Sequence, residues 1–199
     1  MANLMNEFQR YLTDDVVVQL TRQIGAKDPN QVKKASYGIA ELLLNAMSNS
    51  ATNQQTGSGL FDAIKRDHDG GILGNLLGTL RGQNQPSNNK TTDGEGIVNH
   101  LLGNKQLEAA QAIGQISGLH IFKAGNLMQI LAPIVMGVVG QKQKSNGLDL
   151  GGLANILLGG NNQQSSQSPA GGLFGKLLDM DGDGNMMDDL LNIGMKMLK

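Results

Sequence analysis

Residues 127–139 read LMQILAPIVMGVV and form the most apolar stretch of the chain. The stretch is bounded by Asn126 and by a Gly-Gln-Lys turn at 140–142, so it is shorter than the roughly 18 residues that indicate a membrane span. It is apolar on nearly every side, which is typical of a helix surrounded by other helices. Pro133 is expected to kink this helix or to split it in two. The stretch therefore predicts a buried central helix and no transmembrane segment.

Two earlier segments show apolar residues at helical spacing. Asp28 and Pro29 predict a helix start, because Asp28 can cap it and Pro29 occupies a position that needs no amide hydrogen. The apolar face of that helix would consist of Val32, Ala35, Ile39, Leu42, Leu43 and Ala46. Residues 14–24 offer a second such face and stop at Gly25. Since no stretch alternates with period two, we predict an all-α protein, a compact multihelical bundle around the central helix.

The composition excludes several classes of function. The 199 residues carry 16 Lys and Arg, 17 Asp and Glu and only 3% aromatic residues, and no dense basic cluster occurs, so nucleic acid is not expected as a partner. The absence of cysteine excludes a disulfide framework, a thiolate zinc site and a cysteine nucleophile. The opening residues MANLMNEFQRYL lack a basic segment followed by an apolar run. We therefore expect no secretory signal and, by default, a cytoplasmic location.

A polar tract divides the chain into a long body and a short C-terminal unit. Residues 160–169 read GNNQQSSQSP, a composition typical of a flexible linker. The predicted organisation is a multihelical body at 1–158, a polar linker at 159–170 and a helix-loop-helix unit at 171–199.

The chain has 28 glycines, about twice the usual share, and nine of them lie in four copies of a recurring motif that we call the glycine word. It reads GILGNLLG at 71–78, GIVNHLLG at 96–103, GLANILLG at 152–159 and GLFGKLLD at 172–179. Each copy predicts a two-turn amphipathic helix, too short to persist alone, that docks on the body or on another copy. Short helices bounded by glycine could also converge on this pattern without being repeats.

The stretch DMDGDGNMMDDL at 179–190 predicts a calcium loop of the EF-hand kind. Acids fall at positions one, three and five, and Gly184 at position six allows the sharp turn. Position twelve is Leu190 in place of the usual Glu, so the loop is similar to shortened bacterial calcium loops that close with an acid at position ten. The predicted ligands are Asp179, Asp181, Asp183, Asn185, Asp188 and Asp189.

Charge favours the same interpretation of this loop. Clustered carboxylates repel one another, and a hard divalent cation such as Ca²⁺, which accepts a flexible ring of oxygen ligands, relieves that repulsion. The alternative is a solvated Asp-Gly turn whose last acids favour a helix N-terminus.

The histidines give no local catalytic or metal motif. His68, His100 and His120 are the only three, and no two are spaced three or four apart, as a helical metal pair requires. Capping or surface roles are the expected ones. Ser58 lies in GSG without the rest of a nucleophile elbow. We therefore predict no enzyme, with a site assembled from His68, His100 and nearby acids as the alternative.

Three stretches carry a family resemblance. HDGGILGNLLG at 68–78, DGEGIVNHLLG at 93–103 and LMQILAPIVMGVVG at 127–140, in this order, resemble the YidB-like family of uncharacterised bacterial proteins. The resemblance covers about residues 5 to 145 and implies a compact multihelical domain around a buried helix. It implies no catalytic residue, since the function of the family is unknown.

These features favour a non-enzymatic interaction or scaffold protein with a calcium-stabilised C-terminal helical unit. Its expected partner is another protein or a second copy of the chain. A second hypothesis is a calcium sensor that exposes its Met-rich tail to a partner. Export without a recognisable signal is the alternative location, because weak calcium loops suit the millimolar calcium outside cells.

Overall fold

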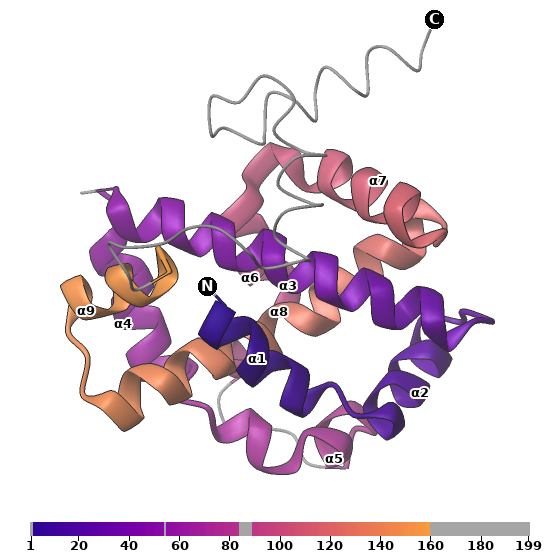
Figure 1. Cartoon of the computed structure of the whole chain (residues 1–199), viewed down its shortest axis with the longest axis horizontal. Helices are drawn as coiled ribbons and strands as arrows, with labels where there is room; N and C mark the ends of the chain where they lie inside the picture. The colour runs from indigo at the N-terminus through magenta and orange to yellow at the C-terminus, as the bar shows by residue number, and fades with distance from the viewer. Residues whose placement is uncertain (1, 54, 84–88, 160–199) are drawn as a thin grey trace, which may run out of the picture. The chain divides into compact units, whose positions relative to one another are not determined.

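The computed structural model describes residues 2–53, 55–83 and 89–159, and all regular elements within these ranges are helices. This confirms the predicted all-α class for the described part of the chain (Figure 1). The elements are α1 (Ala2–Tyr11), α2 (Asp14–Gln23), α3 (Pro29–Thr52), α4 (Gly57–Asp67), η1 (Gly71–Asn75), α5 (Leu76–Leu80), η2 (Asn89–Thr92), α6 (Gly94–Leu102), η3 (Gly103–Lys105), α7 (Gln106–Ser117), α8 (Ile121–Asn146) and α9 (Leu150–Leu157). The proposed C-terminal helix-loop-helix unit lies outside the described residues, and the predicted domain boundaries stay predictions.

Helix α8 is the predicted central helix, and every residue from 131 to 140 in it is buried. It packs against α1, α3, α4, α6, α7 and η1. The helix is longer than the apolar stretch that predicted it, and it runs through Pro133 without splitting. Proline removes one backbone hydrogen bond, and burial of residues 131–140 stabilises the helix across this position.

Helix α8 also has the length and composition of a membrane span. Among the described helices it alone passes that test, with a mean hydropathy of 1.5 over 18 residues. In this structure 61% of that window is buried within the protein, as in the core helix of a multihelical domain.

The two helices predicted from caps and spacing form as expected. The Oδ1 of Asp28 accepts a hydrogen bond from the amide of Asn30 at 2.8 Å, and Pro29 is the first residue of α3. The predicted face of α3 is buried, with Leu42 half-buried. Helix α2 ends before Gly25, whose φ of 61° is left-handed. Figure 1 shows α2 near the beginning of α3 and α4 with α9 near its end.

The glycine words give three different outcomes. The words at 96–103 and 152–159 form most of α6 and α9, which pack on the body and are followed by the positive-φ residues Gly103 and Gly159. The prediction of one helix for 71–78 is wrong, because η1 and α5 meet at Asn75. The Asn75 side chain accepts a hydrogen bond from Gly78 N at 3.0 Å, and this local cap competes with a continuous helix. The word at 172–179 lies outside the described residues.

Candidate functional site

The end of α4 buries two residues that usually face solvent. Asp67 is 8% exposed and His68, the C-cap of the helix, is 4% exposed. Buried acids and imidazoles need partners, because an unpaired charge in an apolar surrounding is costly. We call the group formed by Arg66, Asp67, His68, Thr91 and Asp93 the polar cluster.

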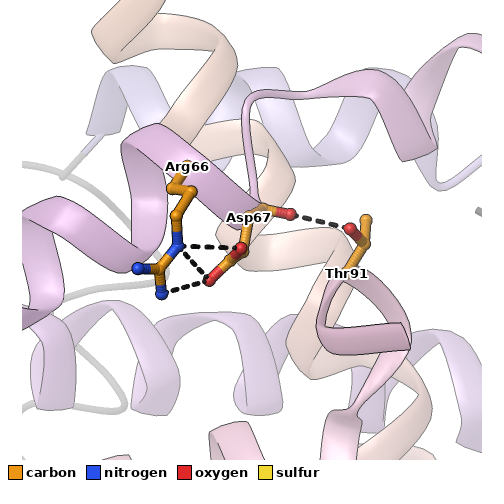
Figure 2. Close-up of polar contacts among 3 residues, drawn as sticks. All are labelled: Arg66, Asp67 and Thr91. Atoms are coloured by element: carbon orange, nitrogen blue, oxygen red, sulfur yellow. Dashed lines mark hydrogen bonds and ion pairs between the residues drawn. The ribbon is translucent and has the colours of Figure 1, made fainter. Parts of the chain in front are cut away.

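Asp67 is held by its neighbour in sequence and by the segment before α6. Figure 2 shows the guanidinium of Arg66 facing both carboxylate oxygens of Asp67, with Nη2 at 2.9 Å from Oδ2 and Nε at 3.2 Å from each oxygen. These hydrogen bonds and the charge of Asp67 raise the pKa of Arg66. The hydroxyl of Thr91 donates to the backbone carbonyl of Asp67 at 2.9 Å. Thr91 thereby attaches η2 to the end of α4.

His68 is the least satisfied polar residue of the cluster. Its Nδ1 has no hydrogen-bond partner among the described residues. Burial lowers the pKa of His68, and the charges of Asp67 and Asp93 oppose this shift without cancelling it. The imidazole is therefore neutral at neutral pH, the form that can accept a proton or bind a metal ion. The described residues contain no group of three or more His, Cys, Asp or Glu placed to hold a metal ion.

The backbone after α4 lies directly on α8. A Cβ placed on Gly140 would be 1.7 Å from the carbonyl oxygen of His68, so only glycine fits there. Gly70, with a φ of 94°, approaches the side chain of Gln141, the residue after Gly140. Asp69 accepts from Lys144 Nζ at 2.8 Å and from the amide of Gly71 at 3.0 Å. The bond to Lys144, followed by that to Gly71, lowers the pKa of Asp69.

A similar close contact with α8 occurs at the start of α6, at Asp93 and Gly94. The Oδ1 of Asp93 caps that helix by accepting from Gly96 N at 2.9 Å. A Cβ on Gly94 would lie 1.8 Å from the carbonyl oxygen of Gln129. Gln129 precedes Pro133 by four residues, so its carbonyl lacks the usual helical donor. Glycine at position 94 therefore lets the start of α6 lie directly on this oxygen.

A cleft of about 380 Å³ opens between η1, α5, the start of α6 and α8. Its volume lies in the range of small-ligand sites, about 300–1,000 Å³. Apolar side chains such as Ile72 and Ile134 line it, and Asp93 and Glu95 add two carboxylates. Such a lining would favour a small ligand that donates hydrogen bonds or carries positive charge.

The sequence-predicted site residues have different outcomes. The six predicted calcium ligands, Asp179, Asp181, Asp183, Asn185, Asp188 and Asp189, lie outside the described residues, so the calcium loop stays a prediction. The Nδ1 of His120 caps α8 by accepting a hydrogen bond from the amide of Phe122 at 3.4 Å, which agrees with the predicted capping role.

The other two histidines lie in different surroundings. His100 is exposed on α6, two turns beyond Asp93, whereas His68 is buried beside Asp67 and Asp93. Neither acid had been singled out from the sequence. The available signal was the unusual run of charge and histidine, RDHD at 66–69, directly before two glycines.

Comparison with known proteins gives one match. The family model described as "Bacterial protein of unknown function (DUF937)" matches residues 6–142. The resemblance to YidB-like proteins is consistent with this match. No curated protein and no solved structure matches the chain significantly.

Proposed function

We propose that this chain, which belongs to the bacterial DUF937 family of unknown function, is a non-enzymatic interaction or scaffold protein with a calcium-stabilised C-terminal helical unit. The interaction or scaffold role is best supported by the structural contacts of the residues in the family motifs. Asp69 and Asp93 cap turns or pair with lysine, while Gly94 and Gly140 let backbone segments close on α8. These motif residues thus stabilise the fold, and we place the function on the surface of the body.

The surface of the body offers large apolar side chains to a partner. Leu107, Phe122 and Leu158 are 66%, 73% and 62% exposed. Single exposed apolar residues are common, but Phe122 forms an aromatic pair with His120, their ring centroids 5.4 Å apart. Aromatic rings provide much contact area with few rotatable bonds, which suits protein interfaces. We place the contact with a protein partner at this pair.

Site-specific photo-crosslinking in the bacterium tests this contact. A crosslinking amino acid replaces Phe122 in one strain and Ser145, an exposed polar residue near the other end of α8, in the control strain. We expect an adduct of defined mass at position 122 only, reproduced with the purified partner. Wild-type chains added as competitors should reduce this adduct, whereas Phe122→Ser chains should not. Equal adducts at both positions, or none at 122, would contradict the proposed contact. An adduct of twice the chain mass would identify a second copy as the partner.

The calcium part of the proposal rests on the spacing of the acids at 179–189 in the sequence. Calorimetric titration with Ca²⁺ of the full chain and of Asp181→Ala tests it. We expect about one ion per chain, lost in the variant, because position three of such a loop is a direct ligand. No heat up to millimolar calcium would refute the calcium site and leave the interaction proposal untouched.

A further inference from the structure

At His68 the side chain is buried and the backbone packs tightly against α8. The residue is 4% exposed, and its Nδ1 lacks a hydrogen-bond partner among the described residues. Its carbonyl oxygen faces Gly140 so closely that no Cβ would fit between them. The two residues after the Gly70-Gly71 turn, Ile72 and Leu73, pack on Gly137 one turn earlier in α8. The side chain and the backbone of His68 are therefore both enclosed where the end of α4 meets α8.

The charged groups around His68 already have other contacts. On α4, Arg66 pairs with Asp67; beyond the helix, Asp69 pairs with Lys144 of α8. Asp93, which approaches from the start of α6, accepts the capping hydrogen bond from Gly96. Asp67 and Asp93 are the two whose charge acts on His68. A protonated His68 would therefore have to share one of these acids with the group that the acid already contacts.

We propose that His68 is a pH-sensitive latch, by which we mean that its neutral ring holds the end of α4 and residues 69–73 on α8 and that its protonation releases them. The reason is desolvation, because a charged imidazole at this position loses water without gaining a free acid. Hydration of the charged ring requires the end of α4 to move away from α8, which separates the His68 backbone from Gly140. Release would expose Ile72 and Leu73, which are buried in the closed form.

The direction of the pH effect follows from the lowered pKa of His68 in the folded protein. A histidine in the released segment titrates near the ordinary value of about 6.5. The latched form binds the proton less readily, so its stability is complete above about pH 6.5 and falls as the pH drops through the folded-state pKa. Each pH unit within this window changes the latched-to-released ratio by up to about tenfold.

Hydrogen exchange and NMR of the full chain between pH 7.5 and 4.5 test the latch. We expect His68 to titrate below 6.5 and amide protection at residues 64–73, corrected for intrinsic rates, to fall several-fold on acidification, while α3 keeps its protection. His68→Gln should abolish this dependence, and His100→Gln, which changes an exposed histidine of α6, should preserve it. Asp93→Asn, which keeps a capping side chain, should shift the His68 midpoint to lower pH.

Two results would overturn the proposal. One is a His68 midpoint at or above 6.5 in the wild-type chain, which can be measured even if His68→Gln fails to fold. The other is the same loss of protection with pH in His68→Gln as in wild type, which would assign the effect to other groups.

Discussion

Replacement of Gly140 by alanine tests the contact on which the arrangement of α4 and α8 depends. The added Cβ would lie 1.7 Å from the carbonyl oxygen of His68, and real Cβ atoms essentially never come closer than 3.0 Å to another heavy atom. The two backbones must therefore separate by at least 3.0 − 1.7 = 1.3 Å. Neither atom belongs to a flexible side chain, so the whole end of α4 has to move.

The expected cost combines two opposing effects. Overpacking of a well-packed interior costs about 1–3 kcal/mol and occasionally more. Alanine in place of glycine inside a helix returns up to about 1 kcal/mol through helix propensity. Because the displaced atoms are backbone, we expect the upper part of the overpacking range and a net loss of about 2 kcal/mol. For a domain of this size that corresponds to a melting temperature lower by roughly 4–8 °C.

Thermal unfolding followed by circular dichroism measures this effect, with Gly125→Ala as the matched control. Gly125 lies on the same helix, where a Cβ would meet only Ala110 Cβ at an ordinary 3.8 Å. The control should therefore gain up to about 1 kcal/mol from propensity alone. If Gly140→Ala melts at or above the wild-type temperature, the close approach of His68 to α8 is wrong.

Three further substitutions probe other parts of the fold. Gly94→Ala, whose Cβ would lie 1.8 Å from the Gln129 oxygen, should also destabilise the chain by about 1–3 kcal/mol in urea unfolding; an unchanged midpoint would argue against the contact. Asp28→Ala should cost about 0.5–2 kcal/mol through loss of the α3 cap, and Asp28→Asn should restore most of it if capping is the cause. Leu131→Ala, at a fully buried position of α8, should cost about 2–5 kcal/mol, and a loss below about 1 kcal/mol in calorimetry would mean that α8 is not central.

Features encoded by near neighbours in the chain were predictable. The start of α3 depends on Asp28 and its own following amide, a contact two residues apart. The apolar faces of α2 and α3 follow from spacing alone, and the buried residues Val16, Leu20 and Ile39 lie where that spacing puts them. The central place of α8 followed from residues 127–139, which are apolar on nearly every side.

Contacts between distant segments were not predictable from local pattern. The sequence does not reveal that Asp93 approaches His68 or that Gly140 faces the end of α4, because these pairs depend on how helices cross. Pro133 does not split α8, because packing around the helix outweighs the local cost of the proline. At Asn75 a side-chain cap overrode a helical spacing of leucines that, taken alone, predicted one continuous helix.

The two motifs Asp69-Gly70-Gly71 and Asp93-Gly94 share a role although the elements after them differ. In each, the aspartate accepts an amide hydrogen two or three residues later, and a nearby contact brings backbone onto α8 through a glycine. One motif leads into a 3-10 helix and the other into α6. The residues that the two motifs share therefore specify docking on α8. The residues C-terminal to each motif set the helix type. Convergence on a common way of packing explains this better than repetition of one helical unit. It also means that loss of function on changing these glycines should be traced first to the position of α8.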